Sequence, residues 1–183
     1  KAYITHTSIK PIKGVCGYFE ENGTAAELQE AYYYMASVYR DLNDYPNAVT
    51  YFLKSAEVAE SNSDIDGALW KNAYSQLSYL YNQQFNYSNA LDAAIKGLDI
   101  AEKFNTSNER TYINTSTAYF ESGDTTNATT LCNKAINNIL GNGISKSNAD
   151  IVSKAMYHYT ITNQYLHAGL CYELLKSLPK NEL

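Results

Sequence analysis

Short polar breaks divide the chain into long segments in which apolar residues are spread among Ala, Leu, Glu and Lys. The 183 residues include only nine Gly and three Pro, and Val is rare. No run alternates β-branched with polar residues in the way that a half-buried strand does. The pattern therefore predicts helices of about 14–18 residues that are joined by short polar turns.

Several of the breaks carry residues that commonly begin helices. Thr24 is followed three positions later by Glu27, and Thr106 is followed in the same way by Glu109. Both pairs fit a capping box, in which each side chain accepts a hydrogen bond from the other residue's backbone N–H. Three further helix starts are predicted at Pro46, in a first turn, and at Asp124 and Ser147, as N-caps.

A tyrosine and an alanine recur along the chain with a constant separation of nine residues. The pairs are Tyr39 with Ala48, Tyr81 with Ala90, Tyr119 with Ala128 and Tyr159 with Ala168. Successive pairs are 42, 38 and 40 residues apart. A period of this length predicts a helical repeat, with the Tyr ending one helix and the Ala beginning the next.

Small and aromatic residues occupy further columns in the same register. Three positions before each Tyr stand Ala36, Ser78, Ser116 and Met156. Four positions after each Ala stand Phe52, Ala94, Cys132 and Tyr172, and seven positions after it stand Ser55, Gly97, Ala135 and Leu175. Small residues let antiparallel helices approach closely, and facing aromatic rings fill the remaining space. We therefore expect a core built from pairs of small and aromatic residues.

This register resembles the tetratricopeptide repeat (TPR) family over about residues 24–178. The resemblance implies an all-α fold, a right-handed α-solenoid of antiparallel helix pairs, also described as a TPR-like superhelix. The period exceeds the roughly 34 residues of that family, which implies that the first helix of each pair is longer by about one turn. We predict a single TPR-like domain over residues 1–183, composed of a one-helix partial repeat at 1–22 and repeats at 24–61, 62–104, 106–141 and 146–178. In the first helix, Ile12 and Val15 are expected to face the packing interface.

Residues 17–42 look like the TPR segment of a group of bacterial cell-envelope proteins. The likeness rests on Tyr18, Gly23–Thr24, Glu27 and the runs 31–34 and 38–41. Some members of that group resemble lipoproteins, and others place a TPR sensor segment before a transmembrane helix and a regulatory output domain. The resemblance implies the bacterial cell envelope or periplasm, whereas three unpaired thiols favour a reducing compartment such as the cytoplasm.

Charge and hydropathy exclude two classes of partner. The chain has 14 Lys and Arg against 19 Asp and Glu, a net charge of −5, and no basic run. Nucleic-acid binding through phosphates needs clustered Lys and Arg, so no nucleic-acid partner is expected. No apolar stretch approaches the roughly 20 residues of a membrane span. The chain begins without Met, so we expect an excised or processed piece whose full-length form would still be free to carry a membrane anchor. The oligomeric state is left open.

Groups that would support catalysis or metal binding are sparse. His158 and His167 stand nine residues apart, which suits no metal-ligand spacing, and Cys16, Cys132 and Cys171 form no C-x-x-C motif. A catalytic pair of Cys171 with His167, four positions apart on one helix, is geometrically possible, and the alternative is that the thiols are small buried residues. We expect no enzymatic activity, no cofactor and no metal.

The resemblance implies that the first helices of the repeats line a concave groove that binds a protein or peptide. Carried over in register, the groove residues are Tyr33, Ser37, Arg40, Ser75, Tyr79, Asn82, Ile113, Thr117, Phe120, Ser153, Tyr157 and Thr160. TPR modules that clamp a terminal carboxylate use Lys and Asn where Tyr33 and Ser37 stand here, so that mode is disfavoured.

Aromatic rings with hydroxyl and amide groups suit a peptide or a protein helix laid in a groove. We predict a non-catalytic protein- or peptide-binding scaffold. The alternative function is a ligand-sensing TPR segment of a membrane-associated bacterial transcriptional or signalling regulator. For the individual Tyr residues, the alternative role is packing against the neighbouring repeat.

Overall fold

The computed structural model describes residues 8–62, 65, 67–106 and 108–178. Within these residues the chain forms only helices and turns, which confirms the predicted all-α class. The helices are α1 (Lys10–Asn22), α2 (Ala25–Asp41), α3 (Tyr45–Glu60), α4 (Gly67–Gln83), α5 (Tyr87–Lys103), α6 (Glu109–Glu121), α7 (Thr125–Asn142), α8 (Ala149–Ile161) and α9 (Tyr165–Lys176).

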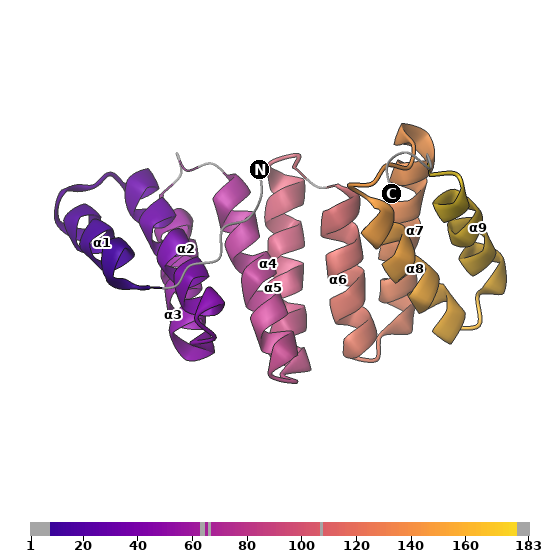
Figure 1. Ribbon diagram of the computed structural model, residues 1–183, viewed down its shortest axis with the longest axis horizontal. Coiled ribbons are helices and arrows are strands. Elements are labelled where there is room, and N and C mark those ends of the chain that lie inside the picture. The colour runs from indigo at the N-terminus through magenta and orange to yellow at the C-terminus, as the bar shows by residue number, and fades with distance from the viewer. Residues whose placement is uncertain (1–7, 63–64, 66, 107, 179–183) are drawn as a thin grey trace. The chain divides into compact units, whose positions relative to one another are not determined.

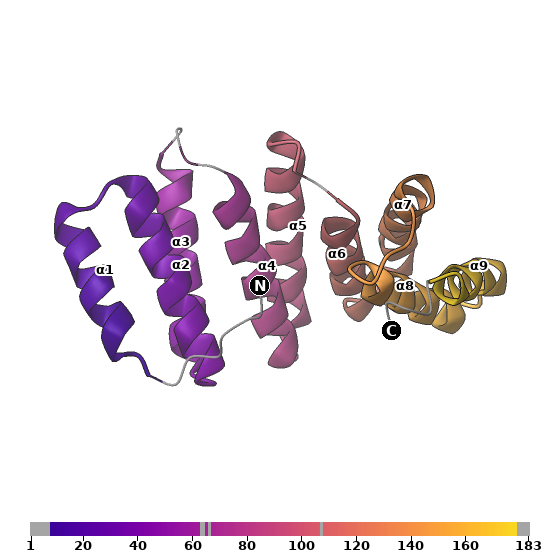
Figure 2. The ribbon, with the colours of Figure 1, turned by 45° about the horizontal axis from the view of Figure 1, so that its top comes forward.

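Contacts divide the chain into two compact units, unit 1 (residues 1–104) and unit 2 (residues 105–183). In unit 1, α2 packs against α3 and α4 against α5, while α4 also contacts α2 and α3, and α1 covers α2 (Figures 1 and 2). In unit 2, α6 pairs with α7 and α8 with α9, and α8 contacts both α6 and α7. Each unit is therefore a stack of antiparallel helix pairs, as in an α-solenoid. The predicted repeat boundaries stay a prediction.

All four helix pairs turn in the same way. At the α2–α3 turn, the N–H of Asp44 donates to the carbonyl of Tyr39 at 2.9 Å, and the N–H of Asn43 donates to the carbonyl of Arg40 at 2.9 Å. This is the Schellman arrangement, which places its penultimate residue in the left-handed region, and Asn43 has φ 60°. Asp44 then caps the next helix, because its side chain accepts from the N–H of Asn47.

Small residues allow the close helix contacts that the sequence predicts. A Cβ atom on Gly97 of α5 would lie 3.4 Å from the Cβ of Tyr74 on α4. Other small residues donate to carbonyl groups of the facing helix: Ser55 to Gln29 at 3.0 Å, and Ser116 to Ala128 at 2.7 Å. Such contacts stabilise the pair at a separation that larger side chains would not allow.

Aliphatic residues fill more of the core than the expected small–aromatic pairing implies. Tyr74 and Tyr159 are buried, but the other repeated tyrosines, such as Tyr39 and Tyr81, are only half-buried at the edge. Fully buried aliphatic residues occupy the centres of the two units; they are Leu77 and Leu80 in unit 1 and Ile113, Ile139, Ile151 and Val152 in unit 2. Tyrosine stays at the edge because its hydroxyl group needs a polar partner or water.

Three helix-start predictions are confirmed. Thr24 and Glu27 form the complete capping box, Pro46 lies in the first turn of α3, and Asp124 caps α7 by accepting from the N–H of Asn127.

Three local predictions are wrong. The side chain of Asn108, not Thr106, caps α6, since it accepts from the N–H of Thr111. The residue before α8 is Asn148, not Ser147. In α1, Val15 is exposed and its neighbour Cys16 is buried instead. Each error is one or two positions, because caps and helix faces depend on local hydrogen bonds and helix rotation that a repeat alignment does not resolve.

Replacing the fully buried Phe52 with Ala is expected to lower the free energy of unfolding by about 3–5 kcal/mol, because it leaves a cavity between α3 and its neighbours. The matched control is Leu53→Ala on the same helix, where the side chain is partly exposed; its loss should stay below about 1.5 kcal/mol. Urea unfolding followed by circular dichroism measures both. Equal losses would contradict the placement of Phe52.

Candidate ligand-binding groove

An open groove of about 440 Å³ lies in unit 1 between the end of α2 and the middle of α4. Its lining residues are Arg40, Asp41, Asn43, Tyr45, Gln76 and Tyr79. We call it the α2–α4 groove. Both helices are the first members of their pairs, and two of the predicted groove residues, Arg40 and Tyr79, belong to its lining.

Arg40 bridges the two helices that form this groove. Its Nη1 donates to the side-chain oxygen of Gln76 on α4. Its Nε and Nη2 donate to the Oδ1 of Asp41 at 3.3 and 3.0 Å. The positive charge therefore has a negative partner inside the groove, which makes the site polar without a strong net charge.

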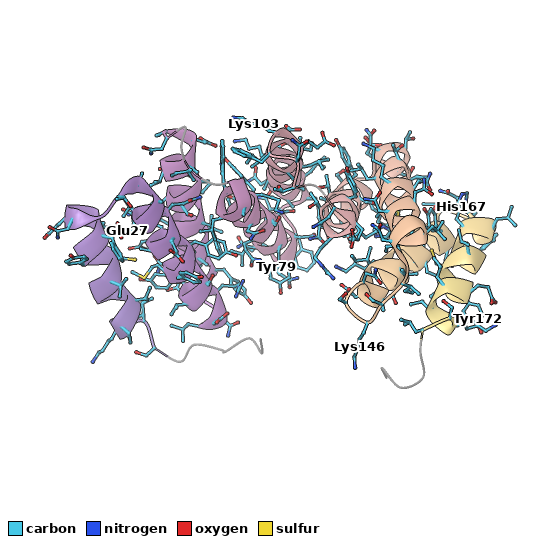
Figure 3. All side chains as sticks on the ribbon, turned by 90° about the horizontal axis from the view of Figure 1, so that it is seen from above. Glu27, Tyr79, Lys103, Lys146, His167 and Tyr172 are labelled. Atoms are coloured by element: carbon cyan, nitrogen blue, oxygen red, sulfur yellow. The ribbon has the colours of Figure 1, made fainter. Side chains whose placement is uncertain are left out.

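Aromatic rings supply the apolar part of the groove. Tyr79 is 52% exposed, and it points to the side of unit 1 opposite Lys103 of α5 (Figure 3). Tyr45 donates from its hydroxyl group to the Oδ1 of Asn43 at 3.2 Å, which holds its ring beside the turn. Two rings and three amide or guanidinium groups thus border one open space.

The remaining predicted residues of unit 1 do not line this groove. The ring of Tyr33 packs edge-on against Phe52 with centroids 5.4 Å apart, and burial raises its pKa. Ser37 is buried and donates to the carbonyl of Tyr33, while Ser75 donates to the carbonyl of Lys71. Asn82 is half-buried near the end of α4. The contact with Phe52 shows that the ring of Tyr33 packs inside its own helix pair.

In unit 2 the predicted residues separate into an inner and an outer set. Ile113 is 0% exposed, so its prediction as a ligand contact is wrong. Thr117 donates to the carbonyl of Ile113, and Phe120 stacks on His158 with centroids 4.8 Å apart. The outer set is exposed on one face of α8 and consists of Ser153, Tyr157 and Thr160.

Four groove residues were missed by the sequence reasoning. Gln76 lies three positions before Tyr79, a spacing that places both on one helix face, so periodicity offered a signal for it. Asp41, Asn43 and Tyr45 come after Arg40, the last groove residue that the sequence predicts in this repeat. The turn residues reach the groove only because α4 packs beside α2.

The Cys171–His167 pair is not arranged for catalysis. Cys171 is fully buried, and burial raises its pKa to about 12. His167 instead stacks on Tyr159 with centroids 5.1 Å apart. A nucleophilic thiol needs a lowered pKa and access to solvent, and Cys171 has neither.

A second thiol, Cys132, lies 3.9 Å from the Nδ1 of His158, a contact that the sequence did not predict. Burial raises the pKa of Cys132 to about 11 and lowers the pKa of His158. Both groups are therefore neutral near pH 7, whereas a reactive pair would be a thiolate beside an imidazolium. Among the described residues, no three His, Cys, Asp or Glu side chains are grouped so that they could hold a metal ion.

Within the part of the chain that the structure describes, no helix is both long and apolar enough to cross a membrane.

Repeated helix pairs, a shared turn and small residues at the pair contacts define a helical-repeat protein. Residues 27–103 match the family model of the tetratricopeptide repeat. Residues 27–103 are therefore a tetratricopeptide-repeat segment. No curated protein sequence matches it significantly.

Solved structures share this fold at low sequence identity. BtubC (BKLC) from P. vanneervenii is 15% identical with a TM-score of 0.76, and the match covers 96% of this chain and 75% of that one. A kinesin light chain from Podosopora anserina with nearly identical TPR-like repeats is 13% identical with a TM-score of 0.71, covering 92% and 84%. The apo form of RapI is 13% identical with a TM-score of 0.79, covering 92% and 47%. At these identities the matches show the fold alone.

Acid should destabilise unit 2 through His158. Because burial lowers its pKa in the folded state, the unfolded chain binds a proton first as the pH falls below about 6.5. The stabilising contribution is therefore complete above that pH and is lost on acidification towards the lower folded pKa. The groups facing His158 are Cys132 of α7, Phe120 of α6, and Lys154 and Tyr157 of α8.

Urea unfolding at pH 7 and pH 5 checks this expectation. His158→Gln should lose less stability between the two pH values than the wild type. An identical pH dependence in the variant and the wild type would contradict the buried, neutral state of His158.

The three thiols should be protected in the folded protein. Cys16, Cys132 and Cys171 are all buried, and burial raises the pKa of each. We expect slow reaction with an aromatic disulfide reagent at pH 8 and rapid reaction in concentrated urea. Rapid modification of Cys171 in the native protein would instead revive a reactive Cys–His pair.

Proposed function

We propose that the chain is a non-catalytic interaction scaffold that binds a segment of a protein or peptide in the α2–α4 groove. The supporting observation is the groove itself, an open space with exposed polar and aromatic side chains on the face formed by two first helices. Proteins of this repeat family are generally non-catalytic scaffolds. The presence of two predicted ligand contacts, Arg40 and Tyr79, in its lining supports this assignment.

The chemistry of the lining matches an extended or helical peptide with few charges. Side-chain amides of Asn43 and Gln76 have donors and acceptors that can pair with peptide N–H and C=O groups. The exposed ring of Tyr79 offers a large contact area at a low cost in conformational entropy. Because Arg40 is paired with Asp41, the groove does not resemble a site built for an isolated carboxylate.

In unit 2, the proposed ligand surface consists of three residues on the outer face of α8. Ser153, Tyr157 and Thr160 stand at helical spacing, and Tyr157 is largely exposed. They offer the same combination of an aromatic ring and hydroxyl groups as the sequence predicts for a ligand surface.

The alternative prediction, a sensing segment of a membrane-associated regulator, rests on the likeness of residues 17–42 to cell-envelope proteins. It stays a prediction, and a full-length sequence with a transmembrane helix and an output domain would support it.

Substitutions in the α2–α4 groove should weaken peptide binding. Peptides are first selected from a random display library on the immobilised wild-type protein, and their affinities are measured by fluorescence anisotropy. Tyr79→Ala and Gln76→Ala should each reduce affinity by about tenfold, as truncation of a central contact commonly does.

The matched control is Tyr18→Ala, which removes an equally exposed tyrosine from α1, outside the groove. Its affinity should equal that of the wild type. If both groove variants bind every selected peptide as tightly as the wild type does, the groove assignment is wrong.

A further inference from the structure

The turn between α4 and α5 differs from the other three helix-pair turns at one position. All four turns place a residue in the left-handed region; these are Asn43 (φ 60°), Phe85 (φ 57°), Gly123 (φ 91°) and Asn163 (φ 59°). Glycine and asparagine are the residues that adopt this conformation readily. A phenylalanine there is strained, because its Cβ crowds the backbone.

Phe85 also loses a hydrogen bond that the asparagine turns have. In those turns the Tyr two positions later donates to the asparagine Oδ1, from Tyr45 to Asn43 at 3.2 Å and from Tyr165 to Asn163 at 2.8 Å. Phe85 has no acceptor to offer, and Tyr87 instead meets its ring edge-on with centroids 6.4 Å apart.

Burial does not compensate for these losses. The ring of Phe85 is 77% exposed, so most of its apolar surface stays in water. The strain opposes folding, and neither a side-chain hydrogen bond nor burial of the ring compensates for it. Strained residues that the fold does not require are commonly found where the protein contacts a ligand.

The chain around Phe85 is uncharged over an unusual length. No Asp, Glu, Lys or Arg stands between Lys71 and Asp92, although these residues make up 18% of the whole chain. Amide residues flank Phe85 in the chain, with Gln84 before it and Asn86 after it. A surface of this composition complements an uncharged partner that brings an apolar side chain.

The position of the turn connects this surface to the α2–α4 groove. Phe85 follows Tyr79 of the groove by six residues; the first four of these continue α4 for about 6 Å, and Phe85 lies in the turn that follows. The turns that follow α2 and α4 lie at the same end of unit 1 (Figures 1 and 2), and the first of them contributes Asn43 and Tyr45 to the groove. A peptide leaving the groove at this end would meet the second turn.

We propose that Phe85 is an anchor for a large apolar side chain of the peptide that occupies the α2–α4 groove. The ligand is then a peptide with an uncharged polar segment over Arg40, Gln76 and Tyr79, next to a residue such as Leu, Phe or Met that packs against Phe85. This inference rests on the proposed function, and it adds the class of ligand and a contact outside the groove.

The test uses the peptides selected on the wild-type protein and the variant Phe85→Asn, which restores the residue of the other turns. We expect its melting temperature to rise by about 2–4 °C, as relief of such strain does in a chain of this size. Its affinity for the peptides should fall by about tenfold or more. Phe85→Leu is the matched control: it keeps an apolar side chain and should bind within about threefold of the wild type.

Two further measurements identify the ligand class. Replacing the large apolar residue of the peptide with Ala should cost as much affinity as Phe85→Asn, and the two changes together should cost little more than one. Affinity should also change little between low and high salt, because residues 72–91 carry no charge and the charge of Arg40 is balanced by Asp41.

The outcomes separate this inference from the proposed function. If Phe85→Asn binds like the wild type while Tyr79→Ala does not, the anchor is wrong and the groove stands. If Phe85→Asn weakens binding and both groove variants bind normally, the groove and the two-part ligand are wrong. A lower melting temperature for Phe85→Asn would contradict the strain at this position. An affinity that falls steeply with salt would contradict an uncharged ligand. Failure of any peptide to bind the wild type would overturn both proposals.

Discussion

Every helix pair in this protein depends on one backbone hydrogen bond at its turn. The N–H groups of residues 44, 86, 124 and 164 donate to the carbonyl groups of Tyr39, Tyr81, Tyr119 and Tyr159, each five positions earlier. The same donor residue directly precedes the second helix of its pair, and at the first three turns its side chain caps that helix. The chain therefore reverses direction over very few residues. The two paired helices then have little freedom to change their relative orientation. The constant interval between Tyr and Ala is the consequence of this turn.

Once the turn is set, the distance between paired helices depends on the residues that face each other. Gly97 lets α5 approach the Cβ of Tyr74 and the backbone of Lys71 on α4. The hydroxyl groups of Ser55 and Ser116 donate to carbonyl groups across the contacts of their own pairs. Close approach explains how a chain with few large aliphatic residues folds into packed units. It also explains why tyrosines lie at the edges, where their rings cover the contact and their hydroxyl groups reach polar partners or water.

The proposed binding surface has two parts with different relations to stability. In the groove, Arg40 joins α2 to α4 through Gln76 and is balanced by Asp41, so binding chemistry and packing support each other. At the α4–α5 turn they oppose each other, because Phe85 occupies a position that favours asparagine and leaves its ring in water. A scaffold of repeated pairs tolerates such a residue, since a turn contributes little to the core that stabilises its neighbours.

The sequence alone determined the fold class and most helix starts, because the turn recurs along the chain, the small-residue columns recur in most pairs, and both are local in the chain. It could not determine the rotation of each helix about its axis. Ile113 was therefore expected in a groove but lies in the core, and the contact between Cys132 and His158 was not predicted. It identified Arg40 and Tyr79 among the groove residues but missed Asp41, Asn43, Tyr45 and Gln76. Only tertiary structure decided that set, because α2 and α4 belong to different pairs and their approach depends on side-chain packing between pairs, which no local pattern encodes.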